Sequence, residues 1–349
     1  MASSFLPHFW RKPSFYRLVA RVMSGIGIIV SCSCTTLPTR EASLAAKPGQ
    51  ILSEPPDESR FVKLKVSIPG VEEACPVWRT RSPGKPVLFL HPINGLNPGL
   101  LHLALEMEKW GYRVYLPSLY GDPIMGESAY GFDKGISVIR FLKQDGRWNP
   151  VATDTMGPIV EDVASIARWV SRKEGGRRIA VIGNSLTGMM PLAILDEPSV
   201  RVAVLGQPAT PALRMHDIAF RIPQSKEKRE ALSISEEKWE SVVSAMRSDS
   251  TKRIIGFHYV EDPLASIDRF DSLNRRLGEA GFRNRFRAYV LGPVGDPYAD
   301  ERSGWVNGGT TAERPRMLLP HSTYGAAENP EDQEWFREQL RKSLGSVSF

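Results

Sequence analysis

The sequence predicts an α/β domain whose central sheet is mostly parallel and carries helices on both faces. Three observations indicate this fold class. Strand-like and helix-like segments alternate from about residue 86 onward. Several of the strand-like segments are short, continuous apolar runs, which is typical of strands buried on both faces. Another strand-like segment, at 178–182, leads directly into a turn that contains a serine and then into a helix-like segment.

The first part of the domain shows this alternation clearly. Residues 85–90 form an apolar run that ends at His91-Pro92-Ile93-Asn94-Gly95, as expected of a buried strand and its turn. A helix should follow and stop at Gly111, because the next apolar residues recur at helical spacing: Leu100, Leu103, Ala104 and Met107. Residues 112–117 are the next predicted strand.

A second helix is expected to begin at Pro158, since proline is well tolerated in the first turn. Its predicted apolar face consists of Ile159, Val163, Ile166 and Val170. Two glycines at 175–176 should end it. The strand at 178–182 then reaches the serine turn, and residues 186–195 are predicted to form the helix behind it.

The remainder of the domain repeats the pattern. Strands are expected at 200–205 and 254–260. A final helix is expected to begin with Asn329 and Pro330, and its apolar face consists of Trp335, Phe336 and Leu340. Residues 208–250, with a helix opened by Ser235, are interpreted as a cap insertion. Residues 292–320 are interpreted as a long loop over the site, with surface decoration as the alternative for either segment.

The serine turn has the sequence Gly183-Asn184-Ser185-Leu186-Thr187-Gly188. A serine on a sharp turn between a strand and a helix is the nucleophile elbow of the α/β-hydrolase fold, and this context makes Ser185 the candidate nucleophile. The turn needs small residues two positions on either side of the serine. Gly183 meets this requirement, whereas Thr187 stands where glycine is more usual, and Gly188 beside it is expected to relieve part of the crowding.

A serine hydroxyl needs a histidine base and an acid that orients the histidine. In this fold the chain order is serine, acid, histidine. Asp262 follows the strand at 254–260 and is the candidate acid, with Glu261 as the local alternative. His321 is the one histidine after that strand, so it is the candidate base. His258 lies within the strand and is interpreted as a core or sheet residue.

The oxyanion formed during acyl transfer needs hydrogen-bond donors. The backbone N–H of Leu186, next to the nucleophile, is one candidate. The other should come from the turn after residues 85–90, and Ile93 is chosen there because Pro92 has no N–H to donate. His91 in the same turn is interpreted as structural, because the position of the base is already taken by His321.

Charge and motifs exclude several other classes of function. The formal net charge of +6 includes four basic residues before a predicted cleavage point; without them 41 basic residues face 39 acidic ones. This balance does not indicate a nucleic-acid partner. No HExxH, Walker A or glycine-rich dinucleotide motif is present, and no cysteine shows metal-ligand spacing, so no cofactor or metal is predicted.

The amino-terminal region has the pattern of a secretory signal. A basic stretch precedes the apolar run 22–30, which is roughly half the ~20 residues that a membrane-spanning helix needs. Predicted boundaries are a signal peptide over 1–31, a flexible tether over 32–58 and an α/β-hydrolase domain over 59–349. In an exported protein Cys34 and Cys75 could pair, but their spacing alone does not establish a disulfide.

Ile29-Val30-Ser31-Cys32 resembles a bacterial lipobox. The resemblance implies a lipid anchor on Cys32 at the cell envelope, with the outer membrane favoured because Ser33 is not an aspartate. The alternative is an ordinary cleaved signal peptide or an uncleaved apolar stub, with Cys32 incidental.

Residues 86–340 resemble the dienelactone hydrolase family of the α/β-hydrolases. The resemblance is carried by Phe89-Leu90-His91-Pro92-Ile93-Asn94-Gly95-Leu96-Asn97, by the segment 111–121 and by the serine turn. It implies a hydrolase that cleaves esters or lactones without a metal. Family members of the namesake type carry cysteine where Ser185 stands and glutamate where Pro92 stands, so this chain is a serine variant.

The sequence therefore predicts an exported serine hydrolase that cleaves a small ester or lactone substrate through Ser185, His321 and Asp262. Two alternatives remain at this point. One is an α/β-hydrolase-fold envelope protein without catalytic activity, suggested by Thr187. The other is a lipid-directed lipase or acyltransferase, because a membrane-anchored enzyme would meet lipids.

Overall fold

The computed structural model describes residues 56–93, 95–119, 146–212, 222–260, 262, 264–292, 305–307 and 330–347. The predicted signal peptide, Cys32, Cys34, Glu261 and His321 lie outside these residues, so their assignments stay predictions. Every helix and strand named below belongs to one compact unit formed by residues 47–213 and 225–349. Within the described part of the chain, no helix is both long and apolar enough to cross a bilayer.

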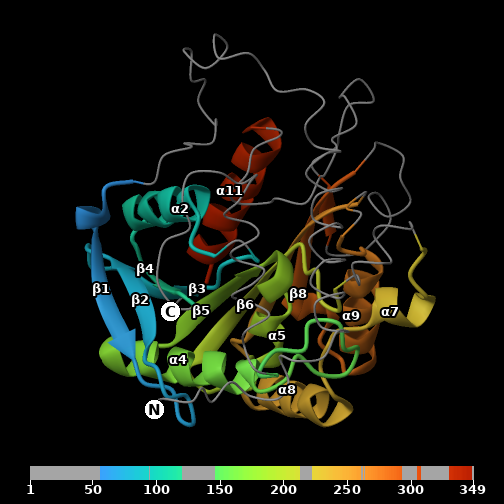
Figure 1. Cartoon of the computed structure of the whole chain (residues 1–349). Coiled ribbons are helices and arrows are strands. Elements are labelled where there is room, and N and C mark those ends of the chain that lie inside the picture. Colours follow the sequence, from blue (N-terminus) through green and yellow to red (C-terminus); the bar gives the residue numbers. More distant parts are fainter. Residues whose placement is uncertain are drawn as a thin grey trace, which may run out of the picture. The chain divides into compact units, whose positions relative to one another are not determined.

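Nine strands of the described chain form one sheet (Figure 1). In chain order they are β1 Phe61–Val66, β2 Cys75–Thr80, β3 Lys85–Phe89, β4 Tyr112–Pro117, β5 Ile179–Asn184, β6 Val200–Gly206, β7 Arg253–Tyr259, β8 Phe286–Leu291 and β9 Trp305–Asn307. Their spatial order is β1-β2-β4-β3-β5-β6-β7-β8-β9. The β1/β2 and β2/β4 pairs are antiparallel, and the other pairs are parallel. The predicted mostly parallel sheet is confirmed.

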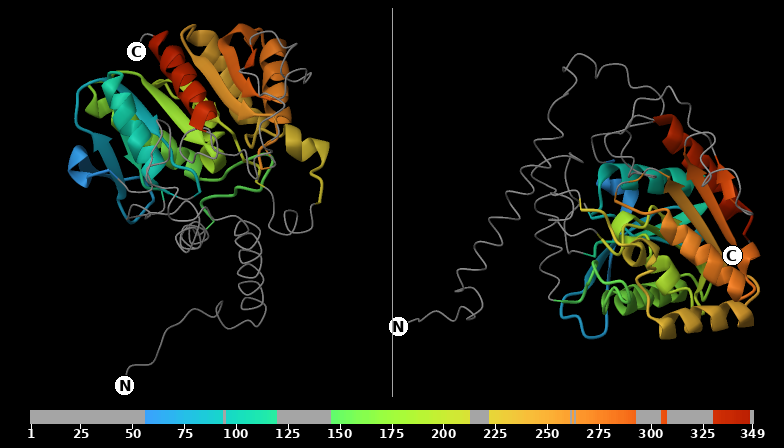
Figure 2. Two further views of the ribbon diagram at one scale, coloured as in Figure 1. Left: turned by 90° about the horizontal axis from the view of Figure 1, so that it is seen from above. Right: turned by 90° about the vertical axis from the view of Figure 1, so that its right-hand side faces the viewer.

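Helices cover both faces of the sheet, as Figures 1 and 2 show from three directions. They are α2 Pro98–Lys109, α4 Ile159–Lys173, α5 Met190–Ala193, α7 Lys226–Glu230, α8 Glu236–Ser248, α9 Asp268–Glu279 and α11 Pro330–Gly345. Buried residues of α2 and α11 form one apolar cluster with one face of the sheet. Buried residues of α4, α5, α8 and α9 form a second cluster with the opposite face.

The continuous apolar runs of the sequence are explained by these two clusters. Successive side chains of a strand point to opposite faces, so a strand with helices on both sides needs apolar residues at every position. In β3, Val87 and Phe89 pack in the cluster of α2 and α11, whereas Leu88 packs in the cluster on the other face. All three side chains are fully buried.

One predicted helix is wrong in its extent. Instead of a continuous helix over 186–195, the chain forms a 3-10 turn, η4 Ser185–Thr187, followed by the short helix α5. Pro191 explains the break, because it has no N–H to donate to the carbonyl of Thr187 four residues earlier.

The segment 208–250, interpreted from sequence as a cap, contains α7 and α8 within its described part. Helix α8 is opened by Ser235, whose hydroxyl accepts a hydrogen bond from the backbone N–H of Lys238 at 3.1 Å. Trp239, Val242 and Met246 of α8 are buried in the cluster that contains α4 and α5. The role of the whole segment as a cap stays a prediction.

A buried carboxylate at the end of α4 joins this helix to β4 and to the segment that leads into β5. The side chain of Glu174 is 2% exposed and pairs with Arg113 of β4 at 3.0 Å and with Arg177 at 2.5 Å. The hydroxyl of Tyr115 donates a third hydrogen bond to the same carboxylate. Burial acts to raise the pKa of Glu174, but the hydrogen bonds from Tyr115 and Arg113 outweigh it and hold the pKa below its usual value.

Glu174→Gln is expected to lower the free energy of unfolding by about 2 kcal/mol, because hydrogen bonds to a charged group are lost and Arg113 is left beside a neutral amide. Since the pKa of Glu174 is lower in the folded state, this stabilisation is present above the unfolded-state pKa and is lost as the pH falls through the folded-state value. Urea unfolding at neutral and at acidic pH measures both effects. Glu338→Gln, at an exposed ion pair, is the matched control and should cost less than about 0.5 kcal/mol. Equal losses for the two variants would contradict this account.

Candidate active site

The order of strands reverses direction at β3. The next strand in the chain, β4, pairs with one edge of β3, and β5 pairs with the other edge. At such a reversal the loops at the carboxyl ends of two adjacent parallel strands diverge and leave a crevice in which ligands bind. Here those loops are the turn after β3, which contains Ile93, and the turn after β5, which contains Ser185 and Leu186. The predicted nucleophile and both predicted oxyanion donors therefore follow neighbouring strands at the switch point.

Ser185 has an unusual backbone conformation. Its φ is +56°, in the left-handed region that residues with a side chain rarely adopt. The conformation turns the chain sharply from the extended β5 into η4, and the serine is 7% exposed. Strain of this kind is found at functional sites that the surrounding structure holds in place. The turn has the geometry of a nucleophile elbow.

The glycines of the turn allow this sharp change of direction. A Cβ at position 183 would lie 2.1 Å from the carbonyl oxygen of Thr187 and 2.8 Å from Cδ of Pro191. A Cβ at position 188 would lie 2.5 Å from Cα of Pro208, in the loop that follows β6. Gly188 therefore permits a close approach of the loop that follows β6.

Gly183→Ala is expected to lower the free energy of unfolding by about 3 kcal/mol, because the methyl group would overlap backbone atoms that cannot move without opening the turn. Denaturant unfolding measures this loss. Gly345→Ala is the matched control, since a Cβ there meets nothing within 4 Å. A Gly183→Ala protein as stable as the Gly345→Ala protein would show that the turn is looser than described.

Asp262, the predicted acid, is buried beyond the end of β7 at 7% exposure. Its Oδ1 accepts hydrogen bonds from the backbone N–H groups of Leu264 at 2.8 Å and Ala265 at 3.2 Å. Its Oδ2 accepts a hydrogen bond from Nε2 of Gln207 at 2.8 Å. The carboxylate is thus oriented by donors from two loops at the carboxyl edge of the sheet.

Gln207 and Arg269 are site residues that the sequence analysis missed. Gln207 follows β6, has a φ of +38° and is fully buried. Because β6 lies between β5 and β7, a polar residue at its carboxyl end falls between the serine and the acid. That position was the signal from which Gln207 could have been found.

Arg269 of α9 is a fully buried guanidinium. It donates to the carbonyl oxygens of Pro208 at 3.0 Å and Pro211 at 2.9 Å. Burial lowers the pKa of Arg269 to about 10, although the charges of Asp262 and Asp268 act to raise it. The guanidinium therefore anchors the loop after β6, and the N–H of Ala209 in this loop donates to the carbonyl of Ser185 at 2.9 Å.

The two described histidines near the site occupy structural positions, as the sequence analysis predicts. Nε2 of His91 accepts a hydrogen bond from the N–H of Leu119 at 3.0 Å, and Nδ1 lies 2.7 Å from the carbonyl oxygen of Pro92. Burial lowers the pKa of His91 to about 4, so the ring is neutral over the physiological range. His258 is fully buried within β7 and packs edge-on against Phe270.

Cys75, at the start of β2, is buried, and its Sγ lies 3.5 Å from the carbonyl oxygen of Ser118. Burial raises the pKa of this thiol to about 12, with the charge of Asp162 adding to the effect. Cys75 is therefore protonated at neutral pH and is not a candidate nucleophile. Among the described residues, no group of three or more histidine, cysteine and acidic side chains is placed to hold a metal ion.

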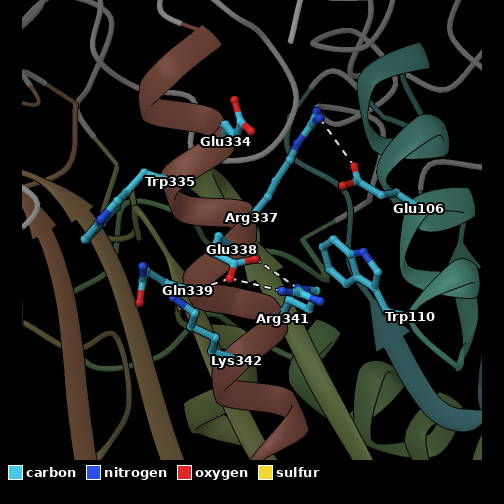
Figure 3. A pocket seen from close by; sticks show the side chains of 9 residues that line it. All are labelled: Glu106, Trp110, Glu334, Trp335, Arg337, Glu338, Gln339, Arg341 and Lys342. Carbon is cyan, nitrogen blue, oxygen red and sulfur yellow. Dashed lines mark hydrogen bonds and ion pairs between the residues drawn. The ribbon is translucent and has the colours of Figure 1, made fainter. Parts of the chain in front are cut away.

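A surface groove of about 760 Å³ lies elsewhere, between α2 and α11 (Figure 3). It is lined by Glu106, Trp110, Glu334, Trp335, Arg337, Glu338, Gln339, Arg341 and Lys342. Arg337 and Glu106 approach each other across it at 3.4 Å. None of the lining residues follows a strand at the switch point, so this groove is separate from the candidate active site.

No protein-family model matches the sequence, and no curated protein matches it. Solved structures that resemble this chain include a dienelactone hydrolase-like promiscuous phosphotriesterase from metagenomic libraries, with 11% identity, a TM-score of 0.48 and coverage of 82% of this chain and 99% of that one. An esterase of Pyrococcus furiosus has 13% identity, a TM-score of 0.47 and coverage of 84% and 99%. Oligopeptidase B of Leishmania major has 11% identity, a TM-score of 0.44 and coverage of 81% of this chain and 35% of that one.

The assignment of the fold rests on the chain's own geometry. The sheet has one strand near its beginning, β2, that runs antiparallel to all the others, a reversal of strand order at β3 and a strained serine immediately after β5. Together these features identify the fold as that of the α/β-hydrolases.

Proposed function

We propose that this chain is a serine hydrolase that cleaves carboxylic esters or lactones, with Ser185 as nucleophile, His321 as base and Asp262 as the acid that orients the base. The observation that carries the proposal is the left-handed backbone of Ser185, directly after β5 at the switch point of the sheet. A strained serine at this place in the sheet is what a nucleophile elbow requires.

The proposed reaction follows from these roles. Oγ of Ser185 bonds to the carbonyl carbon of the substrate while its proton passes to the imidazole of His321. The carbonyl oxygen becomes an oxyanion, which accepts hydrogen bonds from the N–H groups of Leu186 and Ile93. The intermediate collapses, the alcohol leaves with the proton from the imidazolium, and a water molecule then hydrolyses the acyl-enzyme by the same steps.

The surroundings of Asp262 support its role as the acid. A triad acid must stay in one place to hold the imidazole in orientation while the ring gains and loses a proton. Three donors, from Leu264, Ala265 and Gln207, point at the carboxylate. These three hydrogen bonds hold the carboxyl group in one orientation.

The substrate class and the location come from the sequence. The resemblance of residues 86–340 to the dienelactone hydrolase family favours an ester or a lactone over an amide. The signal pattern of residues 1–31 supports export, and the lipobox-like segment supports a lipid anchor at Cys32. On these patterns we propose a location at the bacterial cell envelope.

Hydrolysis of a matched set of substrates tests the proposed reaction. We expect p-nitrophenyl acetate and dihydrocoumarin, an aromatic lactone, to be hydrolysed, with kcat/KM for p-nitrophenyl palmitate lower by about tenfold or more, a difference typical of a misfit in an apolar pocket. A peptide p-nitroanilide serves as the amide control and should not be cleaved. A preference for the palmitate would make the protein a lipid-directed lipase, and a preference for the anilide would make it a peptidase.

A further inference from the structure

Thr187 is the residue of the serine turn that departs from the usual pattern, in which glycine occupies this position. Its side chain is fully buried at the end of η4, two residues after Ser185. The hydroxyl is therefore held inside the protein between the two turns of the candidate site. A buried hydroxyl needs hydrogen-bond partners, and these partners indicate what it does.

The partners come from the end of β5 and from the turn after β3. On its own turn, the hydroxyl oxygen accepts a hydrogen bond from the N–H of Asn184 at 3.0 Å. Towards β3, the hydroxyl lies 3.2 Å from the carbonyl oxygen of His91 and 3.4 Å from that of Leu90. The carbonyl of Asn184, at 3.1 Å, is a further acceptor for the single hydroxyl proton. A glycine could make none of these contacts.

The contact with His91 reaches the turn that contains the second proposed oxyanion donor. The carbonyl of His91 lies two residues before Ile93, and this turn closes with a hydrogen bond from the N–H of Gly95 to the carbonyl of Pro92 at 3.0 Å. The ring of His91 fixes the turn on another side, through Leu119. The other proposed donor, Leu186, is the neighbour of Thr187 itself. The Thr187 hydroxyl thus connects the backbone segments of both proposed donors.

We propose that Thr187 is a positioning residue of the hydrolase, whose hydroxyl connects the serine turn to the turn after β3 and so sets the separation of the Leu186 and Ile93 N–H groups. The inference rests on the proposed function. An oxyanion is stabilised only by donors that lie within about 3 Å of it, so a small displacement of one turn weakens the transition state. Binding of the uncharged substrate depends much less on this separation.

Three variants test the inference. Thr187→Val keeps the shape of the side chain without the hydroxyl, and Thr187→Ser keeps the hydroxyl. Thr80→Val is the matched control. Thr80 is also fully buried, and its hydroxyl oxygen accepts a hydrogen bond from the backbone N–H of Val114 at 3.0 Å. This hydrogen bond lies away from the switch point. The measurements are kcat and KM for p-nitrophenyl acetate, the rate constant for labelling by a fluorophosphonate probe, and the midpoint of thermal unfolding.

Thr187→Val is expected to lower kcat/KM and the labelling rate by about 10- to 100-fold, with KM within about threefold of wild type, because a misplaced donor affects the transition state. Thr187→Ser and Thr80→Val should stay within about threefold in both rates, although Thr80→Val should also lower the thermal midpoint. If Thr187→Val does not fold, Thr187→Ala takes its place in the comparison with Thr187→Ser.

Two results would overturn the inference. One is a hydroxyl-free variant whose rates lie within about threefold of wild type. The other is an equal loss of rate in Thr187→Ser, or in the control Thr80→Val, which would reduce the role of Thr187 to packing or general stability. Both differ from failure of the proposed function, in which the wild-type protein would be neither labelled at Ser185 nor active on any ester.

Discussion

Replacing Ser185 with alanine is expected to lower kcat/KM for p-nitrophenyl acetate by about 10⁵-fold or more, since the bond-forming oxygen is lost and the rest of the triad cannot act without it. The fold should be retained. Alanine, like serine, has a Cβ, so the strain of the left-handed backbone at position 185 is unchanged. Steady-state kinetics together with a denaturant unfolding curve measure the two properties separately.

Ser233→Ala is the matched control for this variant. Ser233 is also buried, and its φ is +55°, close to that of Ser185, but its hydroxyl donates to the carbonyl of Ala152 at 3.1 Å in another part of the structure. Its activity should lie within about twofold of wild type. Esterase activity that survives in Ser185→Ala would remove this serine from the mechanism.

Asp262→Asn is expected to lower kcat by about 10⁴-fold, the scale observed when a triad acid is replaced by its amide. The amide carries no charge to stabilise the imidazolium of His321. The new amide also places an N–H₂ group at the position of Oδ2, which now accepts a hydrogen bond from Nε2 of Gln207 at 2.8 Å. Two donors would then face each other, so the side-chain amide of Gln207 would have to flip and present its oxygen. KM should change by less than about threefold, because the acid does not contact the substrate.

Two further variants separate the acid from its neighbours. Asp268→Asn makes the same chemical change at a carboxylate that pairs with Arg229 at 2.6 Å, and it should leave kcat within about twofold of wild type. Glu261→Gln tests the alternative acid, which lies outside the described residues. If Glu261→Gln is inactive and Asp262→Asn is active, the role of the acid passes to Glu261.

The fold could be predicted from local sequence patterns, because its strands and helices carry strong local signals. Residues 86–90 are apolar at every position because both faces of β3 are covered, and this makes the run recognisable without knowledge of its neighbours. The two glycines at 175–176, with φ values of +71° and +80°, end α4 as expected. The helix after Ser185 is shorter than the sequence predicts, because Pro191 interrupts the backbone hydrogen bonds that would continue it.

The site could be predicted only in part, because several of its contacts join residues far apart in the chain. Ser185 stands out because its neighbours form a strand and a turn. Gln207 meets Asp262, 55 positions later, and Arg269 meets the carbonyls of Pro208 and Pro211 only once β6 and α9 are packed together. Thr187 is unusual in the sequence, but two of the carbonyls near its hydroxyl, those of Leu90 and His91, lie in the turn after β3, more than 90 positions earlier in the chain.

The most direct test of the central claim is the position of a covalent adduct on the folded protein. After reaction with diisopropyl fluorophosphate, trypsin should release a modified peptide of residues 179–201, which contains Ser185 and Ser199, and fragmentation of this peptide should place the adduct on Ser185. Protein unfolded in denaturant before the reaction should carry no adduct, because activation of the serine requires the assembled site. An adduct on Ser199 or on another residue, or no adduct on the folded protein, would contradict the assignment of Ser185 as the nucleophile.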